Sequence, residues 1–449
     1  MKKRTIAWMT TAALLAGALT GCGGGGSTGK AAQSAQKEAE TQAVETDPAK
    51  YEVTEKIEIE WWHALEEQYT DTVNKVVDGF NSSQDLITVK PVYVGNYAAV
   101  NEALVAAHAA GTGLPGVSVA NTPFVAEYAA GGLTEDLTPY IQATGFDIED
   151  FGEGLIQATS YEGKQATLPF LISTQVVYYN KDMAKERGLT VPEKWDDMEA
   201  FLEEAAVVNN GQTECYGTII PGWDQWYFET FFLNNGVKIV NDDQVSTDLG
   251  GETSAKMVEQ IKDWYKKGYI DYVENPDNSS TMRQNFIDGK TFSVVHTSSL
   301  YNTYVENCNF EVGMAWLPAG ETKNQEVGGS ALLIPAKNDQ ATKNAAWQFL
   351  SYLCSKDVNM IWASETGYLP TRNSVQTTEE GQEFLKEKPE FQVIFDNLNL
   401  IQPRIQHPGW NQLATIWKNS LAEIIKEDVN LNDMLETMAE EIDEVLEDA

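Results

Sequence analysis

The chain of 449 residues has 42% hydrophobic residues, 10% aromatic residues and a formal net charge of −36. Such an excess of carboxylates repels nucleic acid and anionic headgroups, which argues against nucleic-acid binding and against a membrane contact through basic patches. About 400 residues follow the N-terminal segments described next, a length that favours two domains.

The first 21 residues have the pattern of a secretory signal, with basic residues at 2–4 and an apolar stretch over 5–19. That stretch is shorter than the roughly 20 residues that a helix needs to cross a bilayer. Cys22 directly follows Leu19-Thr20-Gly21, which resembles a bacterial lipobox. We therefore predict a signal peptide over 1–21, lipidation at Cys22 and a lipid anchor at the extracellular face of the cell membrane.

Residues 22–54 consist mainly of glycine, alanine and polar residues. A segment of this composition buries too little apolar surface to offset the entropy that ordering costs. We predict a flexible, lipid-anchored linker over 22–54 and a folded part that begins near Lys56.

Strand and helix patterns alternate along the rest of the chain, which predicts α/β units with a parallel sheet. Pro91 falls within one strand pattern and predicts an edge or a bulge there. Residues 168–179 are expected to pass from one domain to the other. Strands are expected over 57–61, 87–94, 116–120, 292–296, 312–318 and 331–335, with a Gly-rich turn between the last two. Helices are expected over 69–80, 97–110, 195–208 and 256–267, and two amphipathic helices close the chain.

The cysteines and histidines of the chain limit which disulfides and metal sites it can form. Apart from Cys22, the chain has Cys215, Cys308 and Cys354, which allow at most one disulfide. Whether Cys308 and Cys354 pair is left open. The four histidines lack metal-ligand spacing, and the sequence contains no nucleotide-binding or hydrolase motif. We expect no metal, no cofactor and no enzymatic activity.

Seven short runs in chain order form one further pattern. They are Trp62-His63-Ala64, Gly95-Asn96-Tyr97, Leu168-Pro169-Phe170, Tyr178-Tyr179-Asn180-Lys181-Asp182, Phe286-Ile287-Asp288-Gly289-Lys290, Gly328-Gly329-Ser330 and Thr366-Gly367-Tyr368-Leu369-Pro370-Thr371. Together they resemble the family 1 extracellular solute-binding proteins of bacterial ABC importers. The resemblance implies an α/β, two-lobed periplasmic-binding-protein-like fold (type II), with a ligand cleft between lobes that close about a hinge. It implies an N-terminal lobe of 55–172 plus 317–367 and a C-terminal lobe of 173–316 plus 368–449.

Within the family, the likeness is greatest to the members that bind glycerol-3-phosphate. The run Gly222-Trp223-Asp224-Gln225-Trp226 resembles their Gly-Trp-x-x-Trp, which implies that Trp223 and Trp226 line the cleft. A tryptophan face suits the C–H surface of a polyol, and the indole N–H can still hydrogen-bond. The alternative is an aromatic core cluster, since four more aromatic residues follow by position 232.

Further positions match ligand-binding residues of the family one at a time. They are Tyr97, Ser173, Ser298 or Ser299, Gly329, Tyr368 and Arg404. The match implies that Arg404 binds phosphate, which a guanidinium can do in bidentate fashion. The alternative for Arg404 is a surface ion pair in a very acidic protein, and for the hydroxyls and Gly329 it is turn chemistry.

One position departs from the family pattern. Asn121 stands in the stretch where these members have a glutamate, so it could bond a ligand hydroxyl only as an uncharged group. This makes a glycerophosphodiester or a neutral sugar an alternative ligand, and Asp224 and Glu127 could hold sugar hydroxyls.

We predict a monomeric substrate-binding lipoprotein that captures glycerol-3-phosphate or a related phosphorylated polyol and delivers it to the permease subunits of an ABC importer. The alternative ligand is a mono- or oligosaccharide. A surface glycosidase is the least supported hypothesis, because abundant carboxylates alone do not indicate a catalytic pair.

Overall fold

The computed structural model describes residues 47–66 and 69–449. The predicted signal peptide, Cys22 and most of the predicted linker lie outside these residues. The folded part begins earlier than expected, at the short 3-10 helix η1 (Pro48–Tyr51). The ring of Tyr51 is only 6% exposed and lies 4.5 Å from that of Tyr140, centroid to centroid. The start near Lys56 is therefore wrong, because one buried aromatic ring anchors a segment of polar composition.

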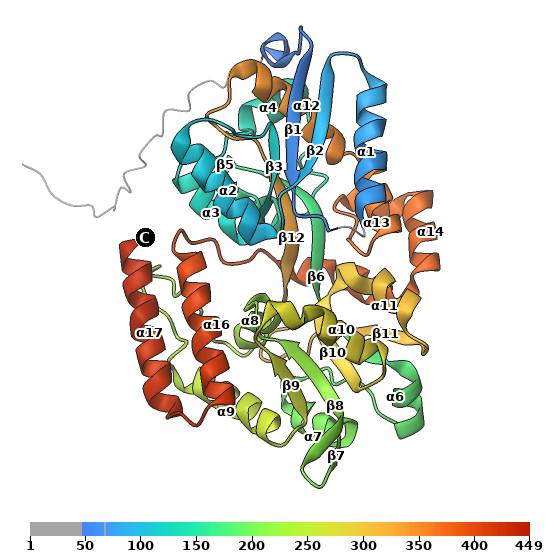
Figure 1. The fold of residues 1–449 in the computed structure, drawn as a ribbon, viewed down its shortest axis with the longest axis vertical. Coiled ribbons are helices and arrows are strands. Elements are labelled where there is room, and N and C mark those ends of the chain that lie inside the picture. Colours follow the sequence, from blue (N-terminus) through green and yellow to red (C-terminus); the bar gives the residue numbers. More distant parts are fainter. Residues whose placement is uncertain (1–46, 67–68) are drawn as a thin grey trace, which may run out of the picture. The chain divides into compact units, whose positions relative to one another are not determined.

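A mixed sheet of eleven strands joins the described part of the chain, in the order β2-β1-β3-β12-β6-β10-β8-β7 (Figure 1). In addition, β11 pairs with β6, β13 with β12, and β9 with β8. The strands are β1 (Ile57–His63), β2 (Ile87–Tyr93), β3 (Val117–Asn121), β6 (Leu168–Asn180), β7 (Val207–Asn209), β8 (Gln212–Pro221), β9 (Ile270–Val273), β10 (Thr291–Thr297), β11 (Val312–Ala315), β12 (Gln325–Leu333) and β13 (Ile401–Gln402). A separate hairpin consists of β4 (Ser160–Tyr161) and β5 (Lys164–Gln165).

The sheet is mixed: besides the pairs described next, β12 is parallel to β13, and β7 is antiparallel to β8. Strand β1 runs parallel to β2 and β3, and β8 runs parallel to β9 and β10. Strand β6 is antiparallel to β12 over its first half and to β10 and β11 over its second half. Strand β2, which contains Pro91, lies at an edge as predicted.

The prediction of a Gly-rich turn before residue 331 is wrong. Gly328 and Gly329 lie inside β12, opposite Ser173 and Ile172 of β6. Gly329 has φ +97°, and a side chain there would collide with the backbone carbonyl of Leu171. The glycine is needed because two backbones approach closely within a strand, and the chain does not reverse there.

Helices cover the sheet, and several match the expected ranges. Helix α2 spans Tyr97–Ala110 as predicted: the Asn96 side chain accepts from the backbone N–H of Ala99, and Gly111 ends the helix at φ 68°. The helix expected over 195–208 is shorter, because the chain enters β7 at Val207. The helices are α1 (Thr70–Ser83), α2, α3 (Val125–Ala130), α4 (Thr138–Thr144), α5 (Glu153–Ala158), α6 (Lys181–Arg187), α7 (Met198–Ala205), α8 (Trp226–Asn234), α9 (Glu252–Lys266), α10 (Ser279–Ile287), α11 (Tyr301–Asn307), α12 (Gln340–Leu353), α13 (Lys356–Glu365), α14 (Glu379–Glu387), α15 (Gln392–Phe395), α16 (Trp410–Lys426) and α17 (Leu431–Asp448).

Three hydrophobic clusters form the core of the described residues. The first joins β1–β3 with α1, α12 and α13, the second joins α7–α9 with α16 and α17, and the third joins α10, α11 and α14. Strand β6 contributes Phe170 to the first, Val177 to the second and Tyr178 to the third. Figure 1 shows β6 and β12 side by side, running from the first cluster toward α8. The predicted lobe boundaries within this arrangement stay a prediction.

Two further sequence questions are answered for the described residues. Cys215, Cys308 and Cys354 are free thiols, so the possible pairing of Cys308 with Cys354 does not occur. Over residues 47–66 and 69–449, the chain forms no helix that is both long enough and apolar enough to cross a membrane.

Candidate ligand-binding site

Trp226 is the first residue of α8 and contacts the paired strands β6 and β12. Its indole ring packs against Gly328 of β12, where any side chain would collide with the ring. The Asp224 side chain accepts a hydrogen bond from the backbone N–H of Trp226 at 3.0 Å. The Gln175 side chain of β6 donates to the backbone carbonyl of Trp226 at 2.7 Å. The ring is 5% exposed, and its Nε1 has no hydrogen-bond partner among the described residues. Ser173 lies opposite Gly328 on β6, so the structure brings Ser173 and Trp226 to the same part of the strand pair.

Trp223 lies just before α8 and is half-buried. Its ring meets Tyr227 edge to face, with centroids 5.9 Å apart, and Trp226 meets the same ring at 5.1 Å. The two predicted tryptophans therefore flank one tyrosine. The aromatic-core alternative applies to the residues that follow, because Phe228 and Phe232 are fully buried.

Tyr97, Ser299, Ser330 and Tyr368 form what we call the hydroxyl cluster. Burial raises the pKa of Tyr97, whose hydroxyl interacts with Ser330 and Tyr368. Burial also raises the pKa of Tyr368 well above its ordinary value, and an interaction with the Ser299 side chain opposes that rise. These hydroxyls therefore stay protonated at neutral pH and can both donate and accept hydrogen bonds. Asn121 lies opposite Ser330 in the pairing of β3 with β12, at the edge of this cluster.

The two candidate serines have different surroundings in η6 (Ser298–Leu300). The Ser298 hydroxyl accepts from the backbone N–H of Thr174 at 3.2 Å, and the Ser298 carbonyl accepts from Tyr178 at 3.0 Å. Ser299 instead shares a 2.9 Å hydrogen bond with the hydroxyl of Thr297 and interacts with Tyr368 within the hydroxyl cluster. Of the two, Ser299 is therefore placed with the predicted tyrosines, and Ser298 serves the backbone of β6.

Arg404, Glu229 and Glu326 form what we call the charge cluster. Arg404 Nε lies 2.9 Å from Glu229 Oε1, and the two side chains are 2% and 0% exposed. With its side-chain oxygen turned toward Arg404, Gln225 accepts from Nη2 at 3.1 Å. Glu326 lies on β12, and its Oε2 accepts from the Thr230 hydroxyl at 3.2 Å. Arg404 thus has a carboxylate partner, but the pair is buried and does not lie at the surface as its alternative interpretation had it.

The two glutamates differ in protonation. Burial raises the pKa of Glu229, and the Arg404 charge opposes that rise. Burial raises the pKa of Glu326 well above its ordinary value, and the neighbouring Glu229 charge raises it further. Of the two, Glu326 therefore favours its protonated form more strongly, and Glu229 is the carboxyl group that faces Arg404.

Sequence reasoning missed Glu229 and Glu326. The signal for Glu229 was its place within the apolar run of α8, where a charged residue is buried only if it has a partner. Glu326 stands two residues before Gly328, on the strand that was expected to be a turn.

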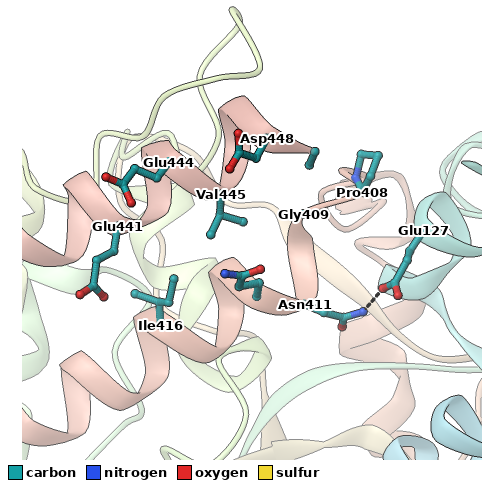
Figure 2. A pocket seen from close by; sticks show the side chains of 11 residues that line it. Glu127, Pro408, Gly409, Asn411, Ile416, Glu441, Glu444, Val445 and Asp448 are labelled. Atoms are coloured by element: carbon teal, nitrogen blue, oxygen red, sulfur yellow. Dashed lines mark hydrogen bonds between the residues drawn. The ribbon is translucent and has the colours of Figure 1, made fainter. Parts of the chain in front are cut away.

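A pocket of about 730 Å³ lies between α3, α16 and α17 (Figure 2). Four carboxylates line it, those of Glu127, Glu441, Glu444 and Asp448. Glu127 and Asn411 point toward each other in Figure 2 and form a hydrogen bond that joins α3 to α16. Glu127, considered above for a sugar, thus lies in a pocket that Trp223, Trp226 and the two clusters do not line. In the described ranges, no group of histidine, cysteine and acidic side chains could hold a metal ion.

Comparisons with known proteins place the fold. A model of the family described as bacterial extracellular solute-binding protein matches residues 75–393. The chain is 26% identical over 359 residues to the sn-glycerol-3-phosphate-binding periplasmic protein UgpB of Pectobacterium atrosepticum, covering 74% of this chain and 77% of that protein.

Two solved structures are similar with a TM-score of 0.77 each. UgpB from Mycobacterium tuberculosis, in complex with glycerophosphocholine, is 21% identical, with 87% of this chain and 99% of that chain covered. The ABC substrate-binding protein Lmo0181 from Listeria monocytogenes, in complex with cycloalternan, is 19% identical, with 88% of this chain and 100% of that chain covered. The predicted α/β fold of the two-lobed binding-protein type is confirmed.

Proposed function

This chain belongs to the bacterial extracellular solute-binding proteins, and from that premise we propose that it captures a phosphorylated polyol of the glycerol-3-phosphate class. It would deliver this ligand to the permease subunits of an ABC importer. Membership in a family of binding proteins agrees with the prediction that the protein is not an enzyme.

The gathering of predicted side chains on the β6–β12 pair carries the proposal. Trp226 and Ser173 lie at Gly328, while Ser330, further along the same strand, interacts with Tyr97, which in turn interacts with Tyr368. An aromatic face with an unpartnered N–H and a group of hydroxyls suits the C–H surface and the hydroxyls of a polyol. The names of the relatives support a glycerol-based ligand.

The proposed mechanism is capture by lobe closure. Two hydrogen bonds support it, because each joins the predicted N-terminal lobe to the predicted C-terminal lobe. Gln406 donates to the carbonyl of Thr122 at 3.2 Å, and Asn411 donates to Glu127. A ligand that contacts both lobes would shift the population toward the closed form, which would dock on the permease.

A neutral sugar is the second candidate, and the Arg404–Glu229 ion pair favours it. The pair offsets the cation that a phosphate ligand would need. A sugar needs no cation, since hydroxyls and a tryptophan face can hold it.

A thermal-shift panel of sn-glycerol-3-phosphate, glycerophosphocholine and maltose tests the proposal. A ligand at about 100 times its Kd adds about 2.7 kcal/mol to the free energy of unfolding. We expect a shift with a glycerol phosphate ester that Trp226→Ala abolishes. A shift with maltose alone would establish the second candidate, and no shift with either ester would rule out the first.

We also propose that the protein acts as a monomer held at the cell surface by a lipid on Cys22. The lipobox-like run supports the anchor. In cells fed labelled palmitate, the wild type should carry the label in the membrane fraction, and Cys22→Ala should lack it. Equal labelling of both proteins would contradict the anchor.

A further inference from the structure

Lys388 is a buried lysine whose ammonium group is held by backbone carbonyls. It directly follows α14, which lies beside α13 (Figure 1), and it is 9% exposed. The ammonium group donates to the carbonyls of Ala363 at 3.1 Å, Ser364 at 3.0 Å and Thr366 at 2.9 Å. An ammonium group has three N–H donors, so all of them are used.

These three carbonyls lie at the end of α13 and at the start of the turn that carries Tyr368. An α-helix leaves its last four carbonyls without donors of its own, and the helix dipole favours a cation beside them. The bond to the Thr366 carbonyl reaches the turn itself. The Thr366 hydroxyl accepts in turn from the backbone N–H of Tyr368 at 3.1 Å. Lys388 therefore holds the residue to which the Tyr368 backbone is hydrogen-bonded.

The other side of this turn is fixed by close backbone contacts. A side chain at Gly367 would collide with the backbone of η6. The backbone N–H of Leu369 donates to the carbonyl of Ile172 in β6 at 2.8 Å. The position of Tyr368 thus depends on β6 and η6 on one side and on Lys388 on the other.

We propose that Lys388 is a positioning residue for ligand binding, whose ammonium group fixes the turn over 366–369 and so holds the Tyr368 hydroxyl in the hydroxyl cluster. This inference rests on the proposed function, in which Tyr368 contacts the ligand. It adds a residue that acts through Tyr368 and lies outside the hydroxyl cluster.

The ammonium group loses its proton at a lower pH than an ordinary lysine. Burial lowers the pKa of Lys388 from 10.5 to about 8, and the charges of Glu387 and Glu306 oppose this shift. Two other carboxylates on neighbouring elements, those of Glu365 and Glu390, are paired with other lysines. A neutral amine has two N–H donors for three carbonyls, so the turn should loosen as the pH rises through about 8.

NMR of the full protein with tyrosine labelled with ¹³C at Cζ follows Tyr368 without a ligand. Its signal is assigned by its loss in Tyr368→Phe. In the wild type we expect this signal to shift with a midpoint near pH 8, while the Tyr368 hydroxyl itself stays protonated. In Lys388→Arg, which keeps its charge over this range, the signal should not titrate. Lys386→Arg changes an exposed lysine of α14 and should titrate as the wild type does.

Isothermal titration at pH 7 and pH 9.5 measures the effect on affinity. The probes are sn-glycerol-3-phosphate, glycerophosphocholine and maltose, which keep their charges over this range because a phosphate monoester ionises at about pH 6. Wild-type affinity for the probe that binds should fall about fivefold at pH 9.5, the equivalent of one lost hydrogen bond. The affinity of Lys388→Arg should be equal at both pH values.

Stability should change in the opposite direction to affinity. Relative to Lys388→Arg, the free energy of unfolding of the wild type should rise between about pH 8 and pH 10.5, because only the unfolded state still holds the Lys388 proton there. A loss of affinity over this range is therefore not a loss of folded protein.

The outcomes separate this inference from the proposed function. A Tyr368 signal that stays constant from pH 7 to pH 9.5, or that titrates equally in Lys388→Arg, overturns the inference and leaves solute capture intact. A titrating signal with constant affinity overturns it as well. If circular dichroism shows Lys388→Arg to be unfolded, the wild-type signal and affinity still decide. Binding of none of the three probes at either pH overturns the proposed function, while the NMR titration still shows whether Lys388 positions Tyr368.

Discussion

The charge cluster and the hydroxyl cluster each have one member on β12, Glu326 and Ser330, but hold their polar groups in different ways. The charge cluster depends on an ion pair between Arg404 and Glu229 with almost no solvent contact. The hydroxyl cluster depends on neutral hydroxyls from three elements and one loop, including Tyr97 and Tyr368. A buried charge needs its partner, whereas a buried hydroxyl needs only one hydrogen bond.

This difference gives the two regions different hydrogen-bonding capacities. The groups of the hydroxyl cluster can both donate and accept hydrogen bonds, whereas the charge cluster already pairs its guanidinium with a carboxylate. The predictions below test whether the two regions differ as described, from the largest expected effect to the smallest.

Removing the cation of the charge cluster should have the largest effect. In Arg404→Ala, Glu229 stays buried without its partner, so we expect the free energy of unfolding to fall by about 3–5 kcal/mol. Urea denaturation followed by circular dichroism measures the change.

Two further variants show whether the loss of stability comes from the buried ion pair. Lys386→Ala removes a pair whose lysine is 75% exposed and should change stability by less than about 0.5 kcal/mol. The double variant Arg404→Leu with Glu229→Leu should recover much of the loss, because it removes both buried charges. A loss below about 1 kcal/mol in Arg404→Ala would show that the ion pair matters no more than a single hydroxyl.

Displacing Trp226 should have the next largest effect. In Gly328→Ala, the added methyl group collides with the indole ring, and overpacking of this kind costs about 1–3 kcal/mol. Because the ring would move, ligand affinity should fall along with stability. Gly152→Ala is the matched control, since its methyl group would lie 3.8 Å from the Asn373 side chain, an ordinary contact. Unchanged affinity in Gly328→Ala would argue against Trp226 as a ligand contact.

The stability that the charge cluster contributes should also depend on pH. This dependence should lie below the pH range in which the tyrosines of the hydroxyl cluster titrate. Glu326 has a raised pKa in the folded protein, so the folded state holds more protons than the unfolded state above about pH 4.5. Stability from this group is complete below pH 4.5 and is lost as pH rises through the folded pKa, at up to about 1.4 kcal/mol per pH unit.

Urea denaturation from pH 4.5 to 8 measures this slope. In Glu326→Gln the contribution should disappear, so the difference between wild type and variant should change with pH. Tyr97→Phe should show no such change over this range, because the pKa of Tyr97 lies above 10. Parallel curves for wild type and Glu326→Gln would contradict the raised pKa.

Removing one hydroxyl should have the smallest effect on stability. Tyr97→Phe deletes a hydroxyl that interacts with Ser330 and Tyr368, at a cost of about 1 kcal/mol. Ligand affinity should fall more clearly, because the same hydroxyl would bond the ligand. Tyr93→Phe, at a tyrosine that is 55% exposed, should leave both unchanged. Full affinity in Tyr97→Phe would limit the hydroxyl cluster to a structural role.

Local sequence patterns predicted the elements well where a helix or strand depends on its own residues. The helix over 97–110 was predicted at both ends, because Asn96 and Gly111 are caps that act within one turn. The strand that contains Gly328 and Gly329 was predicted as a turn, because the reason for those glycines is the close approach of Leu171 and Trp226. Contacts made by distant residues are invisible to a local pattern.

The sequence by itself determined the α/β class, the family and the tryptophan pair at the start of α8, since these follow from periodicity and short motifs. Only the tertiary structure decided that Arg404 is balanced by Glu229 and that Ser299, not Ser298, borders the tyrosines. The physical reason is that a charge or a hydroxyl has a function only through its partners and its solvent contact. Both depend on residues that folding brings together from distant parts of the chain.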